Sequence, residues 1–297
     1  MDNAIEKPKK NLSESIRQRL KNLSDQRNRP FDEILRYYAM ERFLYRLSIS
    51  SHAKKFFLKG GLMLKVWDSL DHRATMDIDL LAKTSNQIDN LHRIITEVSE
   101  IACEEDGIAF DTQKLILRNT QTGGDYNGVS SSFSAKLFTT KMPVLIDIGF
   151  NDIIIPKPQQ IQYPTLLGMP EPTLLGYTLE TIIAEKLESV VKLALVNTRM
   201  KDFYDLWTIL KNHEIQPDNL NIAIQEVFAN RKTPLKRPIA FTAEFYESKE
   251  TQQRWNNFLS AMGKERIKLE DVILELSKST SRFFENESGY NNPFYPQ

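Results

Sequence analysis

The chain has 297 residues, with 39 Lys and Arg against 39 Asp and Glu, so its formal net charge at pH 7 is zero. Hydrophobic residues make up 41% and charged residues 26%, which excludes a disordered chain and fits one large domain or two ordinary ones. The single cysteine, Cys103, excludes an intramolecular disulfide and a cysteine-based zinc site. The balanced charge also excludes the strongly basic composition of many nucleic-acid-binding proteins.

The N-terminal residues have no apolar segment after their charges, so we expect no secretory signal. No window approaches the roughly 18 consecutive apolar residues that a membrane span needs. We therefore expect a cytoplasmic protein without a membrane partner.

Residues 13–50 follow a helical pattern that Pro30 interrupts, which predicts two helices. This stretch is locally basic and has two interpretations. It is either a pair of solvated helical faces, because Asp and Glu are interleaved, or a surface that meets RNA phosphates. The basic residues are Arg17, Arg19, Lys21, Arg27, Arg29, Arg36, Arg42 and Arg46.

Residues 56–155 are typical of a mixed α/β sheet, because strand and helix patterns alternate. A short helix is expected to open at the glycine pair Gly60-Gly61, and a longer one to follow over 87–101. A turn is expected at Gly123-Gly124-Asp125, between two of the predicted strands. The predicted strands cover residues 78–81, 114–117, 132–139 and 144–150.

The second half of the chain has mainly helical patterns. A proline-rich loop is expected over 156–172, then a long amphipathic helix over 178–196. Further helices are expected from 202 to 210 and across most of 218–285, before an irregular tail over 286–297. The predicted fold class is α/β (α+β), with an N-terminal helical segment (1–52), a mixed-sheet core (53–172) and a helical C-terminal domain (173–297).

Asp77 and Asp79 lie two residues apart on a predicted strand, so both side chains point to the same face. Adjacent carboxylates repel each other unless a cation lies between them, and Mg²⁺ prefers such hard oxygen ligands. The upstream pair Gly60-Gly61, at a helix start, allows backbone N–H groups to approach a phosphate closely. Either feature alone also occurs by accident or as a surface pair.

Asp147 lies within an apolar strand, where a lone charge is not buried without a partner. Phosphoryl transfer through two metal ions needs several acids held close together. An inward Asp147 completes that set with Asp77 and Asp79. The alternative is that Asp147 faces solvent or caps a turn.

The order of these features, a Gly-Gly pair, then Arg-x-Thr-x-Asp-x-Asp from Arg73, then a strand Asp, resembles the nucleotidyltransferase fold. More narrowly, the chain is similar to the AbiEii/AbiGii toxin family of bacterial toxin–antitoxin and abortive-infection systems. The likeness runs through most of the chain. It includes residues 15–20, 38–47, 146–150, 180–186 and 199–206. One departure is Asn151, where such sequences often carry Gly, and we expect it to alter a turn rather than the acid site.

The resemblance implies roles for each motif residue. Asp77, Asp79 and Asp147 are implied as Mg²⁺ ligands and catalytic residues, and Gly60 and Gly61 as the phosphate cradle. Arg73, Lys186 and Lys201 are implied to neutralise phosphate charge, while Asp202 and Asp205 orient the lysines or the base. Without the resemblance, the sequence favours an exposed helical pair at Lys186. For Lys201, Asp202 and Asp205 on the next helix it allows an ordinary surface ion pair.

The resemblance further implies a Mg²⁺-dependent enzyme that moves a nucleoside monophosphate from an NTP to the 3′ end of tRNA, which stops aminoacylation and growth. It also implies a cognate antitoxin encoded nearby, commonly with a winged-helix DNA-binding part and without a stable complex. The alternatives are transfer to a protein or a small molecule, or a non-catalytic nucleotide-binding module.

Overall fold

The computed structural model describes residues 10–67, 73–121 and 127–284. These residues form two compact units. The first, here called the sheet unit, comprises the described residues up to Asp152 together with Pro158–Tyr177. The second, the helical unit, comprises Ile153–Lys157 and the described residues from Thr178 onward. None of the described helices is long and apolar enough to cross a membrane.

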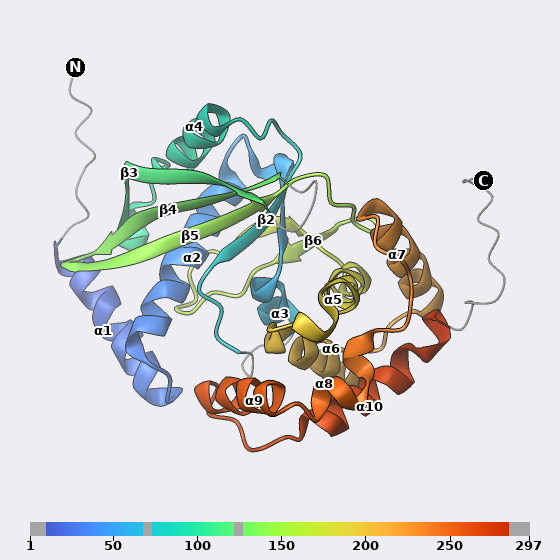
Figure 1. Cartoon of the computed structure of the whole chain (residues 1–297). Helices are drawn as coiled ribbons and strands as arrows, with labels where there is room; N and C mark the ends of the chain where they lie inside the picture. Colours follow the sequence, from blue (N-terminus) through green and yellow to red (C-terminus); the bar gives the residue numbers. More distant parts are fainter. Residues whose placement is uncertain (1–9, 68–72, 122–126, 285–297) are drawn as a thin grey trace. The chain divides into compact units, whose positions relative to one another are not determined.

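The sheet unit is built on a seven-stranded mixed sheet in the order β3-β4-β5-β2-β1-β7-β6 (Figure 1). Strands β2 and β5 are parallel, as are β1 and β7, and the other neighbours are antiparallel. The strands are β1 (Phe56–Lys59), β2 (Ile78–Ala82), β3 (Ile108–Gln121), β4 (Asn127–Leu137), β5 (Thr140–Gly149), β6 (Gln159–Gln162) and β7 (Thr173–Gly176).

Four helices accompany this sheet, of which α2 packs against β5 and α4 against β3. Alternation along β5 explains the packing, because Val144, Ile146 and Ile148 are buried on one face while Asp147 is exposed on the other. The helices are α1 (Lys10–Gln26), α2 (Phe31–Ile49), α3 (Gly61–Trp67) and α4 (Ile88–Ser99), with short 3-10 turns η1 (Ala53–Lys55) and η2 (Glu104–Asp106).

The helical unit is held by an aromatic core that includes the fully buried Trp255 and the pair Phe203–Phe245, whose ring centroids lie 5.3 Å apart. Thr178 caps its first helix by accepting a hydrogen bond from the Thr181 amide at 3.3 Å. Its elements are α5 (Leu179–Leu193), η3 (Ala194–Val196), α6 (Met200–Asn212), α7 (Pro217–Asn230), η4 (Ile239–Phe241), α8 (Ala243–Tyr246), α9 (Lys249–Ala261), α10 (Leu269–Thr280) and η5 (Ser281–Phe283).

The mixed α/β class is confirmed, as are the break at Pro30 and the helix that opens at the glycine pair. The predicted loop over 156–172 is wrong in part, because it contains β6, a polar edge strand whose only buried residue is Ile161. Strands β3 and β4 are longer than predicted, and α5 ends at Leu193 with a 3-10 turn in place of the last helical turn. The expected turn at 123–125 and the tail over 286–297 lie outside the described residues.

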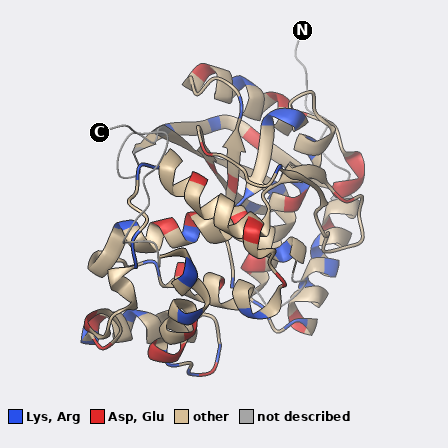
Figure 2. Ribbon diagram, turned by 90° about the vertical axis from the view of Figure 1, so that its right-hand side faces the viewer, with Lys and Arg blue, Asp and Glu red and all other residues tan. Residues whose placement is uncertain are grey.

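Two arginines of the locally basic N-terminal stretch lie in the core and not on the surface. The side chains of Arg42 and Arg46 are 1% and 3% exposed. Arg46 forms a bidentate ion pair with Asp106 at 2.5 and 3.2 Å, which ties α2 to η2. Residues of both charge signs occur along the described helices, as Figure 2 shows.

We expect Arg46→Leu to lower the free energy of unfolding by about 3–5 kcal/mol, because the substitution leaves the Asp106 carboxylate buried without its partner. The matched control is Arg36→Leu on the same helix, since Arg36 pairs with the 79% exposed Asp32. This control is expected to change stability by less than about 1 kcal/mol. Urea unfolding measures both, and equal effects would contradict the assignment.

Candidate active site

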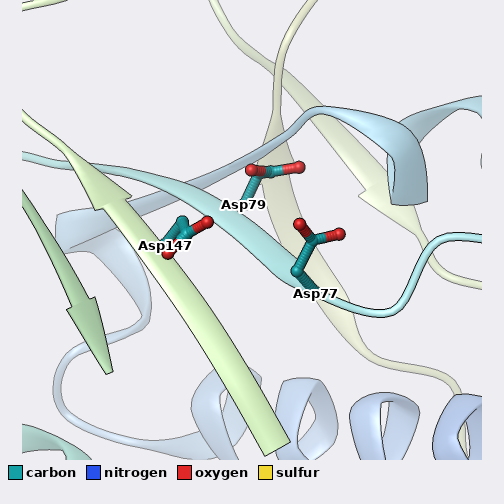
Figure 3. Close-up of side chains that lie close together, drawn as sticks. All are labelled: Asp77, Asp79 and Asp147. Atoms are coloured by element: carbon teal, nitrogen blue, oxygen red, sulfur yellow. The ribbon is translucent and has the colours of Figure 1, made fainter. Parts of the chain in front are cut away.

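Three carboxylates meet where β2 and β5 run side by side. The parallel register pairs Asp79 with Asp147, and Asp77 comes immediately before β2. Each of the three residues offers one carboxylate oxygen, and these oxygens all lie within 4.8 Å of one another. Figure 3 shows the three side chains turned toward a common space.

The donor set fits a divalent cation. Asp77 and Asp79 are half-buried and Asp147 is exposed. The expected inward position of Asp147 is therefore wrong as to burial, because this face of β5 is open to solvent, although its carboxylate lies beside the other two. Hard carboxylate oxygens at this spacing are the ligands that Mg²⁺ takes, usually with water and substrate phosphate in its remaining positions. The sequence predicted that these three acids share a site, and the structure brings them together.

Thr75 fixes the first of these acids. Its hydroxyl donates a hydrogen bond to Asp77 Oδ1 at 2.7 Å, and the residue is 5% exposed. Thr75 belongs to the motif that begins at Arg73, but no role was predicted for it from the sequence. Its position two residues before Asp77 was the available signal.

The glycine pair makes room for the acids. Gly60 has φ +67°, a left-handed conformation, and a Cβ built there would lie 1.9 Å from Asp79 Oδ2. A Cβ on Gly61 would lie 2.8 Å from the Thr75 hydroxyl oxygen. Both positions therefore exclude a side chain, because the site's own residues occupy that space.

A half-buried ion pair lies beside the acid group. Lys59 is paired with Asp79 in the register of β1 and β2, and its ammonium donates to Asp152 at 2.8 Å. The Asp152 side chain is 5% exposed. This pair was not predicted, because no sequence spacing links two residues so far apart in the chain.

Asn151, the departure from the family pattern, has φ +64°. Glycine favours this left-handed conformation, and asparagine tolerates it better than most residues. Asn151 therefore adopts, just after β5, a backbone conformation that glycine takes readily.

Arg73 is half-buried, and its guanidinium donates to the carbonyl of Ala74 at 3.4 Å. It lies in the segment that leads into Asp77.

The other predicted site residues belong to the helical unit. Lys186 on α5 donates to Asp202 at 2.9 Å and to Asp205 at 2.7 Å, both on α6. The lysine side chain is 11% exposed and each aspartate side chain 2%. Arg199 adds a second cation to Asp202 at 2.9 Å. This is a buried network and not the surface ion pair that the spacing alone allowed.

Lys201 is placed differently from its neighbours on α6. It is exposed, whereas Asp202 and Asp205 are buried.

Comparisons with known proteins agree with the family resemblance. The profile of a family described as "Nucleotidyl transferase AbiEii toxin, Type IV TA system" matches residues 42–277, a range that includes every predicted site residue. No curated protein matches the chain.

Two solved structures from Helicobacter pylori align with most of the chain. One, a candidate nucleotidyltransferase, is 14% identical with a TM-score of 0.46, covering 83% of this chain and 92% of that chain. The other, JHP933, is 13% identical with a TM-score of 0.41, covering 82% and 94%.

We expect Gly60→Ala to weaken Mn²⁺ binding at the three acids by at least about tenfold, because the new Cβ displaces the Asp79 carboxylate. Gly168→Ala is the matched control, since Gly168 has the same φ of +67° but a Cβ added there would have no described atom within 4 Å. Both variants lose about 1–3 kcal/mol of stability from the left-handed backbone. Equal Mn²⁺ affinity in the two variants, measured by electron paramagnetic resonance, would refute the steric explanation.

We expect Lys186→Met to lower the free energy of unfolding by about 3–5 kcal/mol, because Asp202 and Asp205 stay buried without their main cation. Lys201→Met, on the exposed side of α6, is expected to stay within about 0.5 kcal/mol of the wild type. Urea titration of both variants makes the comparison. A mild effect of Lys186→Met would contradict the structural part of this network.

Proposed function

Because the chain belongs to the AbiEii family of nucleotidyltransferase toxins, we propose that it transfers a nucleoside monophosphate from an NTP to the 3′ end of tRNA, with Mg²⁺ as its cofactor. The observation that carries this proposal is the group of three carboxylate oxygens within 4.8 Å of one another on β5 and at the start of β2. A nucleotide-binding module that performs no chemistry has little use for three repelling acids at one point.

We assign the three acids different roles in metal binding and proton transfer. Asp77 and Asp79 would hold the Mg²⁺ ions on the triphosphate, and Asp147 would bind the ion on the side of the attacking hydroxyl. When bound, Mg²⁺ supplies Lewis-acid polarisation of the α-phosphate and neutralises the charge of the leaving group. The acceptor hydroxyl loses its proton toward Asp147 as its oxygen bonds to the α-phosphorus. The bond from that phosphorus to the bridging oxygen breaks, and pyrophosphate leaves.

The remaining predicted residues bind phosphate. Gly60 and Gly61 present backbone without side chains beside Asp79 and Thr75. Arg73, Lys186 and Lys201 neutralise negative charge on the NTP. Asp202 and Asp205 hold the Lys186 ammonium in one position, which their hydrogen bonds at 2.9 and 2.7 Å support.

The proposed acceptor of the nucleotide is tRNA. An RNA acceptor needs phosphate contacts, and the N-terminal helices offer them only in part. Lys21 pairs with Asp25 at 2.5 Å, and Arg29 pairs with Glu33. The exposed Arg19 donates to the Leu167 carbonyl at 3.0 Å, which leaves its full charge at the surface. Contacts of this kind weaken as salt rises.

The family is a toxin of a Type IV toxin–antitoxin system. We therefore propose that a cognate antitoxin is encoded nearby and acts without a stable complex, and that the toxin stops growth in the cytoplasm, where charged tRNA is used.

The test is an incubation of the purified chain with each α-labelled NTP, Mg²⁺ and total tRNA, resolved on a denaturing gel. We expect label in the tRNA band, with a loss on the order of 100-fold or more in the Asp77→Asn, Asp79→Asn double variant, which removes metal ligands. The control variant is Asp89→Asn, because Asp89 is exposed on α4 and is expected to keep full transfer.

Three outcomes contradict parts of the proposal. Label on the protein itself replaces tRNA by a protein acceptor. Pyrophosphate release without label in any macromolecule indicates a small-molecule acceptor. Bound NTP with no pyrophosphate release would leave the non-catalytic binding module.

A further inference from the structure

A chain of hydrogen bonds runs from helix α2 to the acid group. The Thr75 amide donates to the Tyr37 phenol oxygen at 3.0 Å, and the Thr75 hydroxyl donates to Asp77 at 2.7 Å. Tyr37 and Thr75 are 8% and 5% exposed. Water therefore competes little for either bond.

Asp77 needs such a support. The ladder between β2 and β5 begins at Ile78, so Asp77 lies just outside the strand pairing that fixes Asp79. The Thr75 amide, in the same irregular segment, finds its acceptor in a side chain. The position of Asp77 thus depends on side-chain bonds, whereas Asp79 and Asp147 are fixed by the sheet.

Tyr37 is itself held in place. The Lys65 ammonium on α3 lies 4.6 Å from the centroid of the Tyr37 ring and 5.3 Å from that of Tyr163. Among the described residues, Lys65 Nζ has no hydrogen-bond partner, so these ring faces and the nearby Glu41 carboxylate are its main compensation.

Burial of this cluster shifts the pKa values of its titratable groups. Desolvation lowers the pKa of Lys65 to about 8 and raises the pKa of Glu41 to about 7. It also raises the pKa of the Tyr37 phenol, which stays neutral and able to accept the Thr75 amide.

We propose that Tyr37 is a positioning residue for the metal site, which sets the orientation of the Asp77 carboxylate through Thr75. It touches neither substrate nor cation. The inference rests on the proposed function only in that a divalent cation binds at Asp77, Asp79 and Asp147. Partners that bond a metal ligand directly, as Thr75 bonds Asp77, typically contribute about 10–100-fold to metal affinity, and Tyr37 acts through this partner.

The chain contains a matched control. Tyr163 lies against the same lysine, and its hydroxyl has no hydrogen-bond partner among the described residues. Tyr163→Phe removes the same hydroxyl from the same buried cluster without touching Thr75. Any difference between the two variants therefore reports on the bond to Thr75.

The experiment is a titration of the full chain with Mn²⁺, followed by electron paramagnetic resonance of the free ion. We expect Tyr37→Phe to raise the Kd for Mn²⁺ about tenfold and Tyr163→Phe to leave it within about twofold. Thr75→Val is expected to match Tyr37→Phe, and Thr75→Ser to restore binding, because serine keeps the hydroxyl that donates to Asp77. Circular dichroism verifies that each variant is folded.

A second readout is the transfer assay. We expect Tyr37→Phe to raise the Mg²⁺ concentration for half-maximal rate while the rate at saturating Mg²⁺ stays near that of the wild type. A purely structural defect lowers the amount of active enzyme and leaves that concentration unchanged.

The outcomes separate the two proposals. Unchanged Mn²⁺ affinity in Tyr37→Phe, beside weakened affinity in Asp77→Asn, overturns the positioning role alone. Unchanged affinity in Asp77→Asn overturns the metal site and the inference with it. A third outcome is that Tyr37→Phe weakens Mn²⁺ binding while the wild-type protein transfers no nucleotide. This outcome supports the positioning role and contradicts the proposed reaction.

Discussion

The site depends on one piece of strand pairing, the parallel register that places Asp79 beside Asp147. Two carboxylates fixed side by side in a sheet repel each other, and the fold cannot relieve this by rotating a backbone that the ladder holds. The surroundings are adapted to this constraint. Gly60 leaves space for Asp79, and the Thr75 hydroxyl compensates Asp77. The exposed position of Asp147 lets solvent share the charge until a cation does.

The acid group and the helix at the glycine pair were predictable from the sequence for physical reasons. An aspartate in the middle of the apolar run of β5 has few explanations, and alternation along the strand places it opposite the buried Ile146 and Ile148. The Asp-x-Asp spacing adds two more carboxylates on one face. The helix at the glycine pair was also predicted from local sequence, because the apolar residues Phe57 and Leu58 lead into Gly60 and Gly61. Each of these patterns lies within a short stretch of sequence, so it can be recognised without a structure.

The features that escaped prediction are those that depend on distant partners. Strand β6 carries one buried residue among glutamines, so its pairing with β7 has no hydrophobic pattern. The sequence around Arg46 is that of an ordinary helical surface arginine, and only the fold brings Asp106 beside it. The spacing of Asp202 and Asp205 is that of an ordinary surface pair, and only the packing of α5 against α6 makes it a buried network. The bond between Tyr37 and Thr75 belongs to the same class.

The pairing of β2 with β5 also sets an order of events during synthesis. Asp77 and Asp79 emerge first, but their partner lies at the end of the β3–β4–β5 meander, and strand pairing across such a separation is slow compared with local folding. Domains begin to fold from the N-terminus while the ribosome still adds residues. A nascent chain that ends before Asp147 lacks the third carboxylate of the acid group. The acid group of a nascent chain is therefore incomplete until Asp147 has been translated and paired with Asp79.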